Sequence, residues 1–397
     1  MTSLLSGIRV LDLTNVLAGP FACHQLVHLG AEVIKVEAVG RGDLARNLGA
    51  DPALNASGMG ISFLAQNAGK KSVSLNLKDP RGKDMLCRLV ETADVLVENF
   101  RPGVMDRLGL NYETLKTINP ALIYCAISGF GQDGPWVARP AYDQIIQGAS
   151  GLMSVTGDST SAPIRAGSPV ADTIGGLTAA MAISAALNAR PRGCMIDVSM
   201  LESLLATMGW VLSNHLIGGQ EPAANGNENP TSAPSGTFQT GNGLLNIAAN
   251  KDEQWDSLCR HLGREELIGH PDYRTREDRK LNRHALRAEL ETSLAAKSAG
   301  DWEGELNALG IPAGAVLTVP EVLQSEHLQS RDFLEEFSNT PAIDRPINVV
   351  SMGVKIDGNR PKVTTPPPAL GADETEVWGA LGYDAQALEE LRNDGVI

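Results

Sequence analysis

The sequence predicts an α/β protein, with a large domain built on a doubly wound, Rossmann-like parallel sheet and a smaller α+β domain. In the first half of the chain, short runs of β-branched and apolar residues alternate with longer helical patterns, which is typical of parallel βαβ units. A polar segment rich in Pro, Gly and Asn (219–236) then interrupts this pattern and indicates a change of domain.

The strands of the large domain are predicted from apolar runs at 8–14, 32–37, 94–100 and 121–128. Between the first two runs lies a helical pattern that begins at Pro20 and ends at Gly30, residues that suit those two positions. A second helical pattern separates the next pair of runs, and a long apolar helix follows Asp172.

Domain boundaries follow from these patterns. We expect 1–200 and 340–397 to form the large domain, 225–325 the small one, and 201–224 and 326–339 to be linkers. The small domain should begin with a hairpin, TFQTGNGLLNIAA, whose Asn242-Gly243 pair is typical of a two-residue primed turn.

Composition narrows the possible partners. The 397 residues carry a net charge of −14, which argues against nucleic acid or an anionic membrane as a partner. Five cysteines without a Cys-x-x-Cys pair indicate neither a disulfide framework nor a zinc cluster. With no signal-peptide pattern and no run of about 18 apolar residues, we expect a cytoplasmic protein without a bound metal.

Two short motifs carry little weight. GRGDLA (40–45) fits a dinucleotide fingerprint, but it follows the second strand and lacks the acidic residue expected about 20 positions later, so NAD is not supported. His24 and His28 have the spacing of metal ligands on a helix, but no third ligand is evident.

The stretch VADTIGG (170–176) raises a sharper question about Asp172. An Asp before a helix is a favoured N-cap, since its carboxylate accepts an unpaired backbone N–H. Gly175 and Gly176 are unfavourable inside a helix and indicate that something approaches the backbone closely. Asp172 could therefore be a cap, a nucleophile at a positive helix end, or both.

Two further stretches supply cations and an aromatic ring. NAGKKSVSLNLKDPRGK (67–83) brings four lysines around a strand-like run, at positions 70, 71, 78 and 83. VENFRPGVMDRLGL (97–110) ends a strand with Asn99, Phe100 and Arg101, and then offers Arg107. A cofactor with phosphates and an adenine would use such groups at the carboxyl ends of the strands.

These stretches occur with several others: L-x-G-I-R-V-L-D-L-T from Leu5, L-G-A-E-V-I-K-V-E (29–37), G-D-L-A-R (42–46), V-E-N-F-R-P-G (97–103), I-S-G-F-G-Q-D-G-P (127–135) and A-D-T-I-G-G (171–176). Together they resemble the class III coenzyme A transferases, the family of formyl-CoA, carnitine and succinyl-CoA-dependent dicarboxylate CoA-transferases. The resemblance covers essentially the whole chain.

The resemblance implies a role for each of these positions. Asp172 would attack the acyl-CoA thioester, giving an aspartyl anhydride and then an aspartyl-CoA thioester, with oxyanions held by helix-end and glycine N–H groups. The positions implied to contact coenzyme A are Leu17, Ala18, Leu75, Lys78, Asn99, Phe100, Arg101, Arg107 and Arg139. Ala38 and Ala68 stand where relatives carry basic residues, and Arg41 or Arg46 would have to compensate.

The family resemblance leaves two alternatives. In the 2-methylacyl-CoA racemases of the same fold, a His acts as acid and base where this chain has Tyr142, whose pKa near 10 suits proton abstraction poorly. A non-catalytic CoA-binding protein is the second. The family architecture implies an interlaced homodimer, and we expect succinyl-CoA as donor and a C4–C5 dicarboxylate as acceptor.

Overall fold

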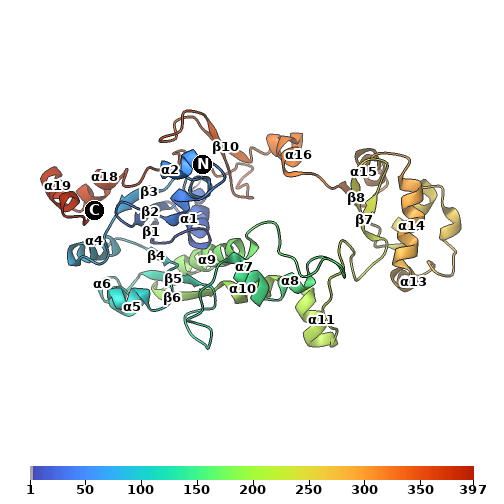
Figure 1. The fold of residues 1–397 in the computed structure, drawn as a ribbon, viewed down its shortest axis with the longest axis horizontal. Coiled ribbons are helices and arrows are strands. Elements are labelled where there is room, and N and C mark those ends of the chain that lie inside the picture. Colours follow the sequence, from blue (N-terminus) through green and yellow to red (C-terminus); the bar gives the residue numbers. More distant parts are fainter. Residues whose placement is uncertain (1–2) are drawn as a thin grey trace. The chain divides into compact units, whose positions relative to one another are not determined.

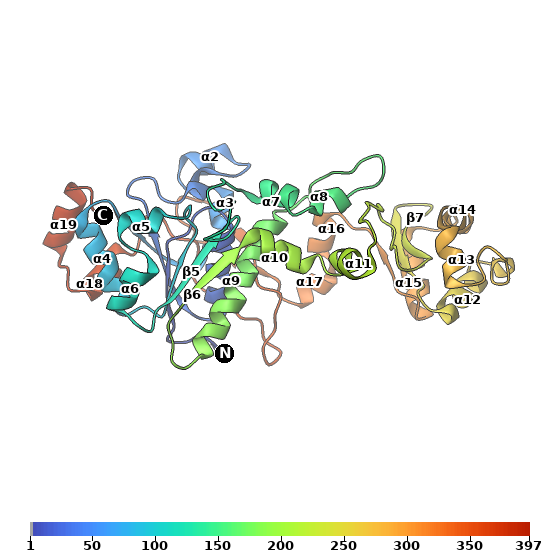
Figure 2. The same ribbon diagram turned by 90° about the horizontal axis from the view of Figure 1, so that it is seen from below.

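The computed structural model describes residues 3–397 and contains two compact units. The first unit comprises the chain up to Leu152 together with Arg165–Gly219 and His327–Ile397. The second comprises Met153–Ile164 and Gln220–Glu326. Figures 1 and 2 show the elements of each unit, and each unit is described here by itself.

The first unit is built on six parallel strands, which confirms the predicted doubly wound fold. They are β1 (Arg9–Asp12), β2 (Glu32–Glu37), β3 (Lys71–Ser74), β4 (Val95–Glu98), β5 (Ile123–Ser128) and β6 (Cys194–Ser199). Their order in the sheet is β3-β2-β1-β4-β5-β6, and all the pairings are parallel. The order reverses between β1 and β4, and ligands of such sheets bind in the crevice beyond the carboxyl ends of the strands at this point.

Helices cover both faces of this sheet. Side chains alternate along each strand, so that Val10 joins one apolar cluster and Leu11 the other. The helices α1 (Ala18–His28) and α9 (Val170–Asn188) contribute to the first cluster. The second cluster is covered by α4 (Pro80–Val90), α6 (Tyr112–Ile118), α18 (Glu374–Ala380) and α19 (Ala385–Asn393). The carboxyl-terminal helices thus complete the core of the first unit, with Trp378 fully buried.

Shorter elements complete the first unit. They are η1 (Leu44–Asn47), α2 (Pro52–Ala56), α3 (Ile61–Leu64), α5 (Val104–Leu108), α7 (Asp143–Ala149), α10 (Met200–Thr207), α11 (Trp210–Gly218), β10 (Leu334–Phe337) and β11 (Ile347–Val350). Two further short helices, α8 (Leu152–Val155) and α17 (Glu326–Ser330), each begin at a boundary between the units.

The second unit has a separate core around Trp255 and Trp302. Its antiparallel sheet consists of β7 (Ser235–Gln239), β8 (Leu244–Ala248) and β9 (Ala313–Ala315). Its helices are α12 (Asp252–His261), η2 (Glu265–Leu267), α13 (Arg276–Leu281), α14 (Arg283–Leu294), α15 (Ala299–Ala308) and α16 (Val319–Gln324).

Several sequence-based details differ in the structure. The predicted hairpin is present, but Gln239 pairs with Leu244 and the Thr240 N–H donates to the Gly243 carbonyl, so the turn is centred on 241–242 and its expected position at Asn242-Gly243 was wrong by one residue. The stretch 201–224, expected as a linker, contains most of α10 and all of α11, and the stretch 326–339, also expected as a linker, contains α17 and β10. Regular structure therefore continues where linkers were expected.

The long apolar helix also needs a correction. By length and composition α9 could cross a membrane, with a mean hydropathy of 1.5 over its most apolar window, whereas no such stretch was expected. A core helix passes the same test, and α9 packs against α1, β5 and β6. Its composition is that of a helix lying between a sheet and another helix.

Candidate active site

A cavity of about 360 Å³ opens at the switch point of the sheet, and Asp172 lines it. We call it the Asp172 cavity. Seven of the predicted site residues share its wall: Leu17, Ala18, Asn99, Phe100, Arg101, Arg139 and Asp172. They come from the loops after β1 and β4, the segment after β5 and the first turn of α9, so the fold brings together positions that are far apart in the sequence.

A second cavity, of about 620 Å³, holds two more of the predicted residues, Leu75 and Lys78. We call it the Lys78 cavity. Phe100 lines both cavities, and Arg41 adds a second cation to the Lys78 cavity. Arg107 lies on the exposed side of α5, a helix that lines this cavity through Val104 and Leu108.

Asp172 does not cap α9, so the cap interpretation was wrong. The helix begins at Val170, and Asp172 lies in its first turn. The capping acceptor is Asp143, whose Oδ1 accepts the N–H groups of Ala171 at 2.9 Å and of Asp172 at 3.4 Å. Gln147 holds the other oxygen of Asp143 through its Nε2 at 2.7 Å. The carboxylate of Asp172 is thereby left available.

The environment of Asp172 raises the pKa of its carboxyl to about 7, mainly through burial and further through the nearby charge of Asp143. Within residues 3–397, no hydrogen bond or ion pair to its side chain is found. A half-buried carboxylate without a partner is more basic than one in water, and is a better nucleophile for that reason.

The two glycines of α9 serve packing between helices. A Cβ on Gly176 would lie 2.6 Å from the carbonyl oxygen of Ala18 and 2.9 Å from the ring of Phe21, so only glycine permits α1 to approach this closely. A Cβ on Gly175 would lie 2.9 Å from Met200 Cγ, part of a flexible side chain. Both glycines lie inside the helix, where helical hydrogen bonds engage their N–H groups.

The first turn of α9 also offers no free donor. Besides the two N–H groups bound by Asp143, those of Val170 and Thr173 bond to the carbonyls of Ser168 and Pro169. The expectation that helix-end or glycine N–H groups of α9 hold an oxyanion was therefore wrong. The start of α1 is different, because within residues 3–397 the N–H groups of Leu17 and Ala18 have no acceptor, and both residues line the Asp172 cavity.

The loop that precedes α1 is tied to the loop that follows β4. Asn99 Oδ1 accepts the N–H of Asn15 at 2.8 Å, and Asn99 Nδ2 donates to the carbonyl of Asn15 at 2.8 Å. The side chain of Asn99 is thus occupied by the protein backbone, and it shapes the wall of the cavity through Asn15.

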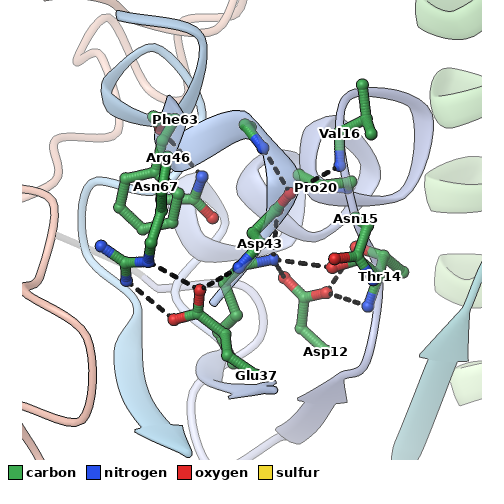
Figure 3. Close-up of polar contacts among 12 residues, drawn as sticks. Asp12, Thr14, Asn15, Val16, Pro20, Glu37, Asp43, Arg46, Phe63 and Asn67 are labelled. Carbon is green, nitrogen blue, oxygen red and sulfur yellow. Dashed lines mark hydrogen bonds and ion pairs between the residues drawn. The ribbon is translucent and has the colours of Figure 1, made fainter. Parts of the chain in front are cut away.

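Beneath this loop lies a network of buried charges (Figure 3). Lys70 Nζ lies 2.8 Å from Asp12 Oδ2, and Lys35 Nζ lies 2.9 Å from Asp43 Oδ2, with all four side chains fully buried. Burial alone would raise the pKa of Asp12, but Lys35 and Lys70 hold it well below its usual range. Lys70 is therefore part of the scaffold and is not available to a ligand.

Other cations considered from the sequence are also accounted for. Arg46 is buried, forms a two-point ion pair with Glu37 at 2.7 Å and stacks on Phe63, so it cannot compensate for Ala38. Arg41 lines the Lys78 cavity together with Ala38 and remains the candidate. Of the other lysines in 67–83, Lys71 pairs with two surface glutamates, and Lys78 alone lines this cavity.

Sequence reasoning missed Asn15, Val16, Asp43 and Asp143 as parts of this region. Asp43 entered the sequence analysis only within the motifs GRGDLA and G-D-L-A-R, without a role of its own, and in the structure it is the N-cap of η1. Asp143 is 29 residues before Asp172, and no spacing rule links a cap to a helix at that distance.

Comparison with known proteins adds an independent line of evidence. The model of CoA-transferase family III matches residues 5–374. A succinyl-CoA:glutarate CoA-transferase from Mus musculus is 38% identical over 397 residues, covering 99% of this chain and 90% of the relative. An acetyl-CoA:oxalate CoA-transferase from Acetobacter aceti is 39% identical, covering 94% and 93%. A crystal structure of a CAIB/BAIF family protein from Brucella suis superposes with a TM-score of 0.82 at 32% identity, covering 94% of this chain and 98% of that one.

Proposed function

Because this chain belongs to CoA-transferase family III, we propose that it moves coenzyme A from succinyl-CoA to a C4–C5 dicarboxylate, with Asp172 as the nucleophile. The observation that carries the assignment of Asp172 is its unpartnered carboxylate, lining a cavity at the switch point of the sheet, with a pKa raised to about 7 by burial.

The proposed reaction proceeds through two covalent intermediates on Asp172. The carboxylate attacks the thioester carbonyl of the donor, forms a mixed anhydride and expels the CoA thiolate. The thiolate then attacks the aspartyl carbonyl, which gives an aspartyl-CoA thioester and releases the donor acid. The acceptor carboxylate attacks this thioester and the steps run in reverse, so that Asp172 is restored.

Each addition places negative charge on a carbonyl oxygen next to Asp172. The unpartnered N–H groups of Leu17 and Ala18 at the start of α1 are suited to stabilise that charge, since both residues line the same cavity. The positive end of the α1 dipole acts in the same direction.

The coenzyme would occupy the Asp172 and Lys78 cavities together. Phe100 lines both and offers an aromatic surface, while Lys78 and Arg41 provide charges for phosphates, with Arg107 nearby on α5. Leu75 gives the Lys78 cavity an apolar wall. No metal and no NAD takes part in the proposed reaction.

The choice of a dicarboxylate rests on relatives and on charge. Proteins similar to this chain are named as transferases of glutarate, oxalate and mesaconate. Arg101 and Arg139 line the Asp172 cavity, and a guanidinium there would pair with the distal carboxylate of a diacid. The guanidinium of Arg139 lies 4.4 Å from the ring of Trp136, which holds it in place.

A substrate panel tests the proposal. Purified protein is incubated with succinyl-, acetyl-, formyl- and 2-methylacyl-CoA against a set of mono- and dicarboxylic acids, with new acyl-CoA species followed by mass spectrometry. We expect transfer between succinyl-CoA and dicarboxylates of four or five carbons. Racemisation of 2-methylacyl-CoA without exchange would favour a racemase, and CoA binding without turnover would favour a non-catalytic protein.

Assembly and compartment remain predictions. We propose a homodimer in the cytoplasm, and the exposed apolar side chains Leu177, Met181, Trp210, Leu216 and Ile217 on α9 and α11 are consistent with a covered surface. Sedimentation or light scattering of the purified protein measures the oligomeric state directly.

A further inference from the structure

Val16, in the loop between β1 and α1, adopts a left-handed backbone conformation with φ +68°. A β-branched residue rarely takes this conformation, because its side chain clashes with its own backbone there. Val16 lines the Asp172 cavity directly beside Leu17 and Ala18, whose N–H groups have no acceptor within residues 3–397. Something in the surrounding structure must hold the turn in place.

A single carboxylate oxygen meets this requirement. Asp43 Oδ1 accepts the N–H of Val16 at 2.9 Å and the N–H of Ala45 at 2.9 Å. The side chain of Asp43 is fully buried, and Figure 3 shows it lying between Val16 and the ion pair of Glu37 with Arg46. Its own backbone N–H donates to Glu37 Oε1 at 2.9 Å.

The charge of Asp43 is held in turn by Lys35. Lys35 Nζ lies 2.9 Å from Asp43 Oδ2 and donates to the carbonyl of Thr14 at 2.8 Å, in the same loop as Val16. Thr14 also donates to Asp12 Oδ1 from its N–H at 2.9 Å and from its hydroxyl at 2.5 Å. Hydrogen bonds to buried charged side chains therefore hold the loop at Thr14 and at Val16, before α1 begins.

We propose that Asp43 is a positioning residue that holds Val16 in its left-handed turn and so aims the Leu17 and Ala18 N–H groups into the Asp172 cavity. The effect of this positioning on ligand binding rests on the proposed function, since it assumes that the cavity takes an acyl-CoA. The contact by which Asp43 holds the Val16 turn, here called the Asp43 clamp, does not depend on the proposed function, because it is present in the loop without any ligand.

Hydrogen exchange of the wild-type protein tests the clamp. The amide of Val16 should exchange at least 100-fold more slowly than the amides of Leu17 and Ala18, because only Val16 donates to a buried carboxylate. In Asp43→Ala the Val16 amide should lose this protection. Equal exchange at Val16 and Leu17 in the wild type would overturn the proposal, whatever the protein binds.

Binding of coenzyme A, measured by calorimetry, tests the consequence. Asp43→Ala should weaken CoA binding about 10-fold, or about 1.4 kcal/mol. Adding Val16→Gly to that variant should restore affinity to within about 3-fold of the wild type, since glycine adopts a positive φ without support. A merely structural Asp43 would not be rescued by a change at Val16.

Asp94→Ala is the matched control. Asp94 also binds a backbone N–H, that of Arg9, and a cation, Arg192, but it lies at the amino ends of the strands. Its loss should lower the unfolding temperature and leave CoA affinity within 2-fold. Wild-type affinity in Asp43→Ala, no rescue by Val16→Gly, or an equal loss in Asp94→Ala would each overturn the positioning role. If the wild type itself binds no CoA, the proposed function fails, and the exchange experiment alone decides the clamp.

Discussion

Two carboxylates near the same cavity show opposite behaviour. Asp12 is fully buried at the end of β1, where Lys70 lies 2.8 Å away, and its pKa is held well below the usual range. Asp172 is half-buried in the first turn of α9 without a partner, and its pKa is raised to about 7, first by burial. Burial acts on both side chains in the same direction, so the partners decide the outcome.

The difference indicates that Asp12 has a structural role, whereas Asp172 is suited to a chemical one. A carboxylate paired with buried lysines has a fixed charge and a fixed position, which suits it to anchor a loop. A carboxylate without a partner retains its basicity and can form a new bond. The following changes would break or sharpen this contrast, beginning with the largest expected effect.

Replacement of the unpaired carboxylate should have the largest effect. Asp172→Asn keeps the size of the side chain but cannot form the anhydride, so transfer should fall by roughly 10⁴-fold or more in steady-state assays. In the wild type, hydroxylamine trapping after incubation with acyl-CoA should label the peptide that contains Asp172. Near-normal exchange by the variant would exclude Asp172 as nucleophile.

The same variant should gain stability at high pH. Because the folded-state pKa is raised, the stability that wild-type Asp172 contributes declines as pH rises from about 4 to about 7. Asp172→Asn removes this decline, so at pH 8 it should be more stable by about 2–4 kcal/mol in urea unfolding, with no gain at pH 4. A gain that is equal at both pH values would contradict the raised pKa.

The importance of the buried ion pair of Asp12 can be tested with two adjacent lysines, one buried and one at the surface. Lys70→Met leaves Asp12 buried with only Lys35 nearby, at 3.9 Å, and should lower the free energy of unfolding by about 3 kcal/mol. Lys71→Met breaks only partly exposed pairs with Glu32 and Glu376 and should cost less than about 1 kcal/mol. Similar losses in urea unfolding would mean that the buried pair is no more important than the surface ones.

The neighbouring glycines of α9 test how closely α1 must approach Asp172. Gly176→Ala places a methyl group against the Ala18 backbone and should lower kcat/KM about 10-fold by displacing the start of α1. Gly175→Ala comes too close only to Met200 Cγ, a side-chain atom that can move, and kcat/KM should stay within about 2-fold of the wild type. A larger loss of kcat/KM in Gly175→Ala than in Gly176→Ala would refute the packing argument.

Cations around the Lys78 cavity should matter mainly for binding. Arg41→Ala and Arg107→Ala should each raise the KM for acyl-CoA by about 3- to 10-fold and leave kcat nearly unchanged, as expected for phosphate contacts. Arg81→Ala is the control: Arg81 pairs with Asp79 and Asp394 on the surface, so its replacement should leave the KM for acyl-CoA unchanged. An unchanged KM would remove the tested arginine from the site.

The smallest expected effect is a shift of the pH profile of transfer when Asp143 is replaced. Transfer should increase about 10-fold per pH unit below pH 7 and level off above it, since only ionised Asp172 attacks. Asp143→Asn retains an oxygen that caps α9 but removes a nearby negative charge, so the apparent pKa should move below 7. An unmoved profile would show that burial alone sets the pKa.

Much of the large unit could be predicted from sequence because its signals are local. The central strands β1, β4 and β5 are largely apolar, as expected for a parallel sheet covered on both faces, and the alternation of strands with helices predicted the fold class. The small hairpin was found from its Asn-Gly pair, but the position of its turn depends on the pairing of Gln239 with Leu244, which the turn residues alone do not determine.

Residues of the candidate site could be predicted only where one short stretch of sequence indicates their role. Asp172 and Phe100 stand out within their own stretches. The functions of Asp43, Asp143 and Lys70 depend on partners far away in the chain: Val16, Ala171 and Asp12. Lys70 was expected among the cations for a cofactor, whereas its side chain, just before β3, is buried against Asp12.

The pairing of Asn99 with Asn15 has a consequence for the mouth of the crevice. By accepting from and donating to the backbone of one residue, the carboxamide ties the loop after β4 to the loop after β1, beyond the last paired residues of the two strands. Two hydrogen bonds of 2.8 Å to the backbone of Asn15 therefore keep the two loops at a fixed separation. An incoming thioester meets an opening whose width is set by these bonds and does not depend on the conformations of surface side chains.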